Sequence, residues 1–338
     1  MRPKSFVFFF VLLSLSALLL AGCGGQSGQK QNAQKKDISV GTGGTGGVYQ
    51  VVGTAIANLI NEKLPDVRAV PEPAPALTQT ARFLNSGEFT IGLVSSDVAA
   101  FARNGIYTFN NEKMPKIRTL IAGHEVGMAY VVLDDSPIKS LADLKGKKVG
   151  ATSPGMSLPL QELAKLYGVQ PNDFEVVYIT FAQQVEALKN RTIDMAVQSA
   201  YPRASALMDL TESQKVRFIS GADKMDQLLE KHPYWKPREV PANTYKGQTK
   251  PYAGAPGQYL LVGINADVDD DLAYNLAKVI LENTPEIAKA HPAGQEYNLE
   301  QVQKFIEKKQ ITVPFHPGAA KYLREKGIAI DNSLVEGK

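Results

Sequence analysis

Short apolar runs alternate with helix-like patterns along most of the chain. The run "ISV" at 38–40 is followed by a glycine-rich loop and then by apolar residues at steps of three and four, which are typical of an amphipathic helix. Next come "VRAV" at 67–70, a helix-like segment at 77–87 and the continuous apolar run "FTIGLV" at 89–94. This order predicts a βαβαβ unit. The apolar positions of its first helix are Val48, Val51, Val52, Ala55, Ile56 and Leu59.

The same order returns further along the chain. The strand-like runs are "KKVG", "FEVVYI" and "IDMAVQS", and the helix-like segments "LPLQELAKLYG" and "QQVEALKN" lie between them. Alternating strands and helices favour parallel sheets with right-handed crossovers. We therefore expect an α/β fold of two similar lobes, each a mostly parallel sheet flanked by helices.

Extended crossings between the lobes are expected at 131–140 and 257–268, which assigns 37–132 plus 259–338 to the first lobe and 133–258 to the second. Two crossings form a hinge, so opening and closing is expected. After the return crossing, 270–290 has the pattern of one long amphipathic helix. The aromatic pair Tyr234 and Trp235, near the second crossing, is expected to pack in the core.

Polar loops follow the predicted strands. In α/β folds with parallel sheets, a ligand binds beyond the carboxyl ends of the strands. If the two lobes face each other, these loops line one cleft. The loops are Gly41–Gly47, Ser95–Asp97, Thr152–Ser157 and Ser199–Arg203.

The first of these loops has five glycines in seven residues, "GTGGTGG" at 41–47. A tight turn needs only one or two glycines, whereas several allow main-chain amides to approach a ligand with no Cβ in the way. Free N–H groups and a partial positive charge at a helix start favour a carboxylate or another small anion. Hydroxyl groups of Thr45 and Tyr49 lie close by in the sequence.

Two nucleotide motifs were considered for the same loop. Gly41, Gly43 and Gly46 satisfy G-x-G-x-x-G, but prolines at 71, 73 and 75 disfavour a dinucleotide fold. The phosphate-binding loop of nucleotide hydrolases needs Lys where Gly47 stands. No cofactor is expected.

The first 22 residues have the features of an export signal, with two basic residues before an apolar run that is short for a membrane span. The boundary "LAGC" resembles the bacterial lipoprotein box, which implies cleavage before Cys23 and lipidation of that cysteine. Residues 23–36 are rich in Gly, Gln and Lys, as in a flexible tether. The expected location is outside the cytoplasm, on a lipid anchor in the cell membrane.

Composition excludes several classes of function. Without the two basic residues of the leader, 35 basic and 34 acidic residues remain, so a nucleic-acid partner is not expected. Cys23 is the single cysteine, and the four histidines form no metal-binding pattern. No nucleophile with its base occurs at a recognised spacing. The chain is therefore not expected to be an enzyme or to hold a metal.

Five ordered motifs resemble the TAXI group of TRAP-transporter solute receptors over about 38–327: "ISVGTGGTGGVYQVVG", "SGEFTIGLVSSDVA", "SPIKSLADLKGKKVG", "HPYWKPREVPANTYKGQ" and "HPGAAKYLREKG". The resemblance implies a two-lobed periplasmic-binding-protein fold of type 2 and capture of a small carboxylate, such as glutamate or a related dicarboxylate. It also implies delivery to an ion-gradient-driven permease. A monomer is expected.

The resemblance also implies which residues of this sequence bind the ligand. In the first lobe they are Gly43, Gly44, Thr45, Tyr49, Ser95 and Ser96, and in the second Ser153 and Ser157 of "SPGMS". The chain departs from the family in "YPRAS" at 201–205. Tyr201 and Arg203 of this segment are further binding candidates. Arg203 is either a solvated arginine at a helix start or a bidentate clamp on a ligand carboxylate.

Two other functions stay open at this point. A receptor for an ATP-driven importer shares the fold and differs in its membrane partner. An exported enzyme that uses the same cleft is the alternative from another class.

Overall fold

The computed structural model describes residues 35–43 and 48–337. The predicted leader, residues 23–34 of the predicted tether with Cys23, and Gly44 and Thr45 lie outside the described residues. Lys36, which the tether was predicted to include, begins the first strand instead. No helix within the described ranges is both long and apolar enough to cross a membrane.

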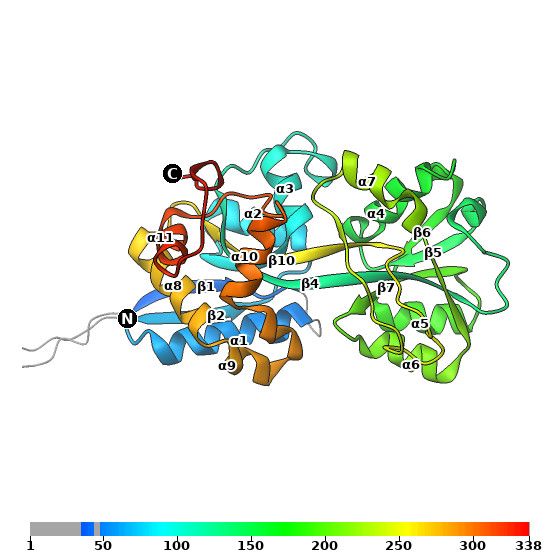
Figure 1. Ribbon diagram of the computed structural model, residues 1–338, viewed down its shortest axis with the longest axis horizontal. Coiled ribbons are helices and arrows are strands. Elements are labelled where there is room, and N and C mark those ends of the chain that lie inside the picture. The colour runs from blue at the N-terminus through cyan, green and yellow to red at the C-terminus, as the bar shows by residue number, and fades with distance from the viewer. Residues whose placement is uncertain (1–34, 44–47, 338) are drawn as a thin grey trace, which may run out of the picture. The chain divides into compact units, whose positions relative to one another are not determined.

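Three parallel strands form the core of the first sheet, in the order β2-β1-β3. Helices α1 and α2 connect them, as the predicted βαβαβ unit requires (Figure 1). β2 lies at the sheet edge, where Pro71 is tolerated because the outer side of an edge strand needs no donor. The bounds are β1 Lys36–Gly41, α1 Val48–Lys63, β2 Val67–Glu72, α2 Leu77–Ser86 and β3 Ile91–Ser95.

The second sheet repeats this arrangement. β6, β5 and β7 are parallel neighbours, in the same 2-1-3 order, with α4 and α5 as connections. The predicted α/β architecture of two similar units is confirmed. The bounds are β5 Lys148–Ala151, α4 Pro154–Lys165, β6 Glu175–Tyr178, α5 Phe181–Lys189 and β7 Met195–Tyr201.

One long strand, β4 (Ile117–Leu133), belongs to both sheets. It pairs antiparallel with β10 (Pro256–Asn265) as far as Val126, and with β7 from Gly127 onward. β10 also pairs with β3, so β10 and β4 connect the two parallel groups (Figure 1). The change of partner therefore lies inside β4, earlier than the crossing predicted at 131–140.

Helices from the end of the chain pack against the first sheet. The single long helix predicted at 270–290 is wrong: the chain forms α8 and α9 with Asn283 between them. Pro285 explains the break, because proline has no N–H to donate and its ring obstructs a continuing helix. The remaining elements are α3 Ser96–Asn104, α6 Ser205–Ser213, β8 Val216–Ile219, α7 Met225–Lys231, β9 Lys236–Pro237, α8 Asp270–Glu282, α9 Thr284–Ala290, α10 Leu299–Glu307 and α11 Pro317–Glu325.

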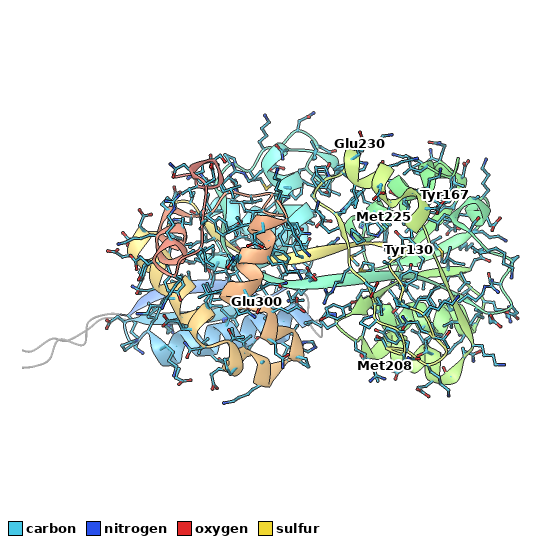
Figure 2. The ribbon with its side chains drawn as sticks, viewed as in Figure 1. Tyr130, Tyr167, Met208, Met225, Glu230 and Glu300 are labelled. Atoms are coloured by element: carbon cyan, nitrogen blue, oxygen red, sulfur yellow. The ribbon has the colours of Figure 1, made fainter. Side chains whose placement is uncertain are left out.

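The periodicity of α1 largely identifies its buried face. Val52, Ile56 and Leu59 are buried as predicted, whereas Val51 is 40% exposed. In the second sheet, Tyr130 of β4 is fully buried and labelled in Figure 2. Its main-chain N–H donates to the hydroxyl of Tyr252, which in turn donates to the main chain of β8. Buried aromatic side chains thus tie the long strand to its neighbours.

Candidate functional site

The predicted binding loops follow the carboxyl ends of parallel strands in both sheets. In the first sheet they come after β1 and β3, and in the second after β5 and β7. A ligand bound between two such edges contacts main-chain donors and short polar side chains. The arrangement can therefore bind a small molecule.

The described part of the glycine loop is Gly41, Thr42 and Gly43. Thr42 is buried, and both its N–H and its hydroxyl bond the carbonyl of Glu72. Gly43 has φ +75°, and a Cβ placed on it would lie 3.0 Å from Cβ of Tyr49. Glycine is therefore needed here both for the backbone conformation and for the close approach of Tyr49. Gly43 and the start of α1 therefore pack closely together.

Tyr49, His124 and Tyr297 form an aromatic cluster, which was not predicted from the sequence. The ring of Tyr49 contacts His124 edge to face, at 5.7 Å between centroids. Nδ1 of His124 lies 3.0 Å from the hydroxyl of Tyr297. Gly123 allows this approach, because a Cβ there would lie 2.9 Å from the Tyr297 ring. His124 belongs to no recognised sequence motif. Only its contacts with residues from distant parts of the chain single it out, and these contacts are visible only in the structure.

Burial sets the charge of this cluster. It lowers the pKa of His124 to about 3, so the imidazole is neutral near pH 7. Burial, followed by the nearby charge of Asp97, raises the pKa of Tyr49 above its ordinary value. Nε2 of His124 is buried and has no hydrogen-bond partner among the residues that the structure describes.

The turn after β3 places Ser95, Ser96 and Asp97 in the interior, all with no exposed surface. Oγ of Ser96 lies 3.5 Å from the carbonyl of Tyr234, at the limit of a hydrogen bond. Oγ of Ser95 forms no hydrogen bond of normal geometry with the described residues. It nevertheless faces Asp97 closely enough to stabilise the charged carboxylate.

Asp97 binds three donors from separate parts of the chain. Its Oδ2 accepts hydrogen bonds from Trp235 Nε1 at 3.0 Å and Gln258 Nε2 at 2.8 Å, and Oδ1 accepts the N–H of Val98 at 2.8 Å. Burial raises the pKa of Asp97, and these donors oppose the rise. Trp235 is fully buried, as expected for the aromatic pair. Asp97 thus joins the start of α3 to β10 and to the segment after α7.

After β5 of the second sheet, Ser153 immediately precedes α4 and Ser157 lies in its first turn. Ser153 is half-buried and precedes the helix, and its side chain does not cap it. Ser157 is buried, donates to the carbonyl of Pro154 at 3.1 Å and lies 3.4 Å from the hydroxyl of Tyr178. Tyr178 is 49% exposed, so this pair presents an aromatic surface to solvent.

Tyr201 and Arg203 follow β7 and differ in environment. Tyr201 is half-buried; its hydroxyl donates to Oε1 of Glu296 at 3.1 Å, and the Arg238 guanidinium lies 4.0 Å from its ring centroid. Arg203 is exposed and forms no hydrogen bond or ion pair with the described residues. The hydroxyl of Tyr245 bonds the main chain on both sides of this turn. It donates to the carbonyl of Ala200 and accepts the N–H of Ala204, each at 2.9 Å.

Glu125 and Glu296 organise a charged network where β4 changes partner. Glu125 pairs with Arg238 at 2.7 Å and Lys304 at 3.0 Å, and its N–H donates to Glu296. A recess beside Glu125 and Arg238 has a volume of about 10 Å³, room for about one water molecule. Sequence reasoning missed this network, since its members come from four separate segments.

A family comparison covers most of the described chain. The model of the NMT1-like family matches residues 40–327. The chain belongs to the NMT1-like family. The matched range contains every residue that the sequence predicts to bind the ligand, in the loops of both lobes.

Solved structures show the fold of this NMT1-like protein at low identity. XAC2383 from Xanthomonas citri, solved with ATP, shares 12% identity over 86% of this chain and 95% of that chain, with a TM-score of 0.50. The periplasmic aliphatic sulphonate binding protein SsuA from Escherichia coli shares 17% over 89% and 83%, with a TM-score of 0.49. An ancestral arginine-binding protein bound to arginine shares 18% over 80% and 99%, with a TM-score of 0.43. At 12% identity the likeness to XAC2383 concerns the fold and not the ligand.

Proposed function

We propose that this NMT1-like protein is an extracytoplasmic solute-binding receptor. It captures a small carboxylate of the glutamate or dicarboxylate class and delivers it to an ion-gradient-driven TRAP-type permease. A lipid on Cys23 holds it to the membrane. The observation that carries the proposal is the pair of parallel sheets whose polar loops follow strand ends, joined by the antiparallel strands β4 and β10.

The two lobes of the receptor correspond to 37–132 plus 259–338 and to 133–258, with β4 and β10 as the hinge. A solute that contacts both lobes stabilises the closed state, which the permease then recognises. The proposal fits the connection between the sheets, since a change of pairing partner within β4 allows a bend without breaking either sheet.

Main-chain amides and hydroxyls would hold the solute from the first lobe. Gly43 and Tyr49 lie at the entry to α1, and Ser95 has a buried hydroxyl without a normal hydrogen bond in the described chain. Ser96 lies beside it, and Gly44 and Thr45 belong to the same loop in the sequence. A carboxylate accepts hydrogen bonds from such donors strongly.

Ser153, Ser157, Tyr201 and Arg203 would meet the solute from the second lobe. Arg203 fits a clamp best, because its exposed guanidinium has no bonded partner among the described residues. Tyr201 would have to exchange or share its bond to Glu296. Nothing in this mechanism requires chemistry on the solute, so we assign a binding function rather than an enzymatic one.

Mass spectrometry of molecules that copurify with the protein is the first test. A thermal-shift panel of amino and keto dicarboxylates follows, with the matching amides as controls. Stabilisation by one carboxylate and not by its amide supports the proposal, since ligand that binds only the folded state raises its stability. A copurifying nucleotide, or no response to any carboxylate, would contradict it.

The partner and the enzyme alternative need separate tests. A neighbouring gene for a large fused permease supports the TRAP assignment, whereas a permease gene beside an ATPase gene favours an ATP-driven importer. Turnover of a bound carboxylate by the pure protein would favour an exported enzyme. Stoichiometric binding with the solute recovered unchanged supports the receptor.

A further inference from the structure

His124 carries a buried nitrogen that the fold leaves without a partner. The side chain is 1% exposed, and Nε2 forms no hydrogen bond within the described chain. Leaving a buried donor or acceptor without a hydrogen bond destabilises a protein, so such an atom usually has a partner when the protein performs its function.

The hydroxyl of Tyr297 fixes which nitrogen carries the proton. This hydroxyl lies 3.0 Å from Nδ1 and is fully buried. A phenol is a better donor than a neutral imidazole, and the main-chain N–H of His124 faces the same phenol oxygen. The hydroxyl hydrogen therefore points to Nδ1, which accepts it. The proton of the neutral ring then resides on Nε2, making that atom a donor.

The His124 ring lies beside the described end of the first predicted binding loop. The ring of Tyr49 contacts His124 at 5.7 Å, and Tyr49 in turn packs against Gly43 of the glycine loop. Strand β10 lies between β3 and β4: its Leu260 pairs with Ser95, and the adjacent Tyr259 pairs with Glu125, next to His124. His124 thus lies behind the described end of the loop after β1 and near the loop after β3.

We propose that His124 is a ligand-binding residue, whose Nε2–H donates a hydrogen bond to a carboxylate oxygen of the bound solute. The inference rests on the proposed receptor function and deepens it by naming a side-chain donor outside the family-derived set. Tyr297 is a positioning residue, because its hydroxyl holds the imidazole in the donating tautomer. Gly123 is required for the same reason, since any Cβ would displace the Tyr297 ring.

The first test measures L-glutamate binding by titration calorimetry. His124→Phe keeps a ring for packing but removes the donor, and we expect at least about a tenfold loss of affinity. His124→Gln keeps an N–H donor and is expected to recover part of the loss. His316→Phe is the matched control: His316 is equally buried, and both of its ring nitrogens bond main-chain groups. We expect this control to change thermal stability and to alter affinity by less than about twofold.

A second measurement does not depend on the variants folding. Nitrogen-15 NMR of histidine-labelled wild-type protein reports the tautomer of His124 directly. A proton on Nε2, with its resonance shifted on addition of L-glutamate, supports the inference. A proton on Nδ1 would overturn it.

The outcomes separate the two proposals. If wild-type protein binds L-glutamate and His124→Phe binds it equally well, the role of His124 is overturned while the receptor function stands. If the wild type binds neither L-glutamate nor any other amino or keto dicarboxylate, the proposed solute class fails and the inference falls with it.

Discussion

Nε1 of Trp235 donates a hydrogen bond of 3.0 Å to Oδ2 of Asp97, across 138 positions of the chain. Both side chains have no exposed surface. The bond attaches the segment after α7 to the first turn of α3, and Gln258 of β10 donates to the same oxygen. A single buried carboxylate therefore connects three segments near the proposed hinge.

The first prediction concerns this bond. Trp235→Phe keeps an aromatic ring but removes the only N–H of the indole, so Asp97 loses one of its donors. We expect unfolding free energy to fall by about 1–3 kcal/mol, because a buried charged acceptor is left less satisfied. Urea denaturation of Trp235→Phe, Asp97→Asn and the double variant measures the coupling. Purely additive effects of the two substitutions would show that the bond does not contribute.

Gly43 provides the second prediction, with Gly146 as its control. Both have positive φ, +75° and +71°, but only Gly43 has a neighbour, Tyr49, within reach of an added Cβ. Each substitution by Ala should cost about 1–2 kcal/mol for the left-handed backbone. Gly43→Ala should cost more and also weaken L-glutamate binding, because Tyr49 must move. Thermal melts and calorimetry measure both effects; equal costs with unchanged affinity would contradict the role of this contact.

The fold was largely predictable because its signals are local. Each strand and helix of the two βαβαβ units has its own apolar period, and the alternation of strands and helices predicts parallel sheets with right-handed crossovers. The break between α8 and α9 was missed although Pro285 was visible, because the amphipathic pattern continues across it. The partner change at Gly127 was missed because the apolar residues Val126 and Met128 flank it, which leaves no mark in the sequence where one sheet ends.

The candidate site was predictable only in its loops. Glycine and serine after a strand are local features, so Gly43, Ser95 and Ser153 could be selected from the sequence. The side chains that pack near the first loop come from distant segments: His124 contacts Tyr49, and its Nδ1 lies 3.0 Å from the hydroxyl of Tyr297, 173 positions away. A single sequence has no periodic or motif signal for such pairs. Chemistry that depends on long-range contact therefore required the structure.

The third prediction is a pH dependence of stability that originates at His124. Burial lowers its pKa from the ordinary 6.5 to about 3, with a smaller effect from His291. Between these values the unfolded chain binds a proton that the folded chain does not. The ionisation of His124 therefore does not lower the free energy of unfolding above about pH 6.5. Below that pH the free energy of unfolding falls, by up to about 1.4 kcal/mol per pH unit.

His124→Phe removes this proton from both states. Between about pH 6.5 and pH 5 the wild type should lose about 2 kcal/mol more than the variant, as measured by urea denaturation at each pH. Tyr49 and Tyr297, which face the imidazole, have pKa values raised by burial and do not titrate in this range. Parallel pH profiles for the two proteins would show that His124 ionises normally in the folded state.

The last prediction tests Arg203 as a clamp. Its guanidinium is exposed and has no hydrogen bond or ion pair in the described chain, so Arg203→Ala should leave thermal stability nearly unchanged. If the guanidinium closes on a solute carboxylate, the same change lowers L-glutamate affinity at least about tenfold, or about 1.4 kcal/mol. Arg203→Lys should restore little, because an ammonium group cannot form the bidentate pair. Arg191→Ala is the control, since Arg191 is an exposed arginine whose partner, Asp135, is also exposed. Equal affinities for Arg203→Ala and the wild type would remove Arg203 from the site and support the alternative of a solvated arginine.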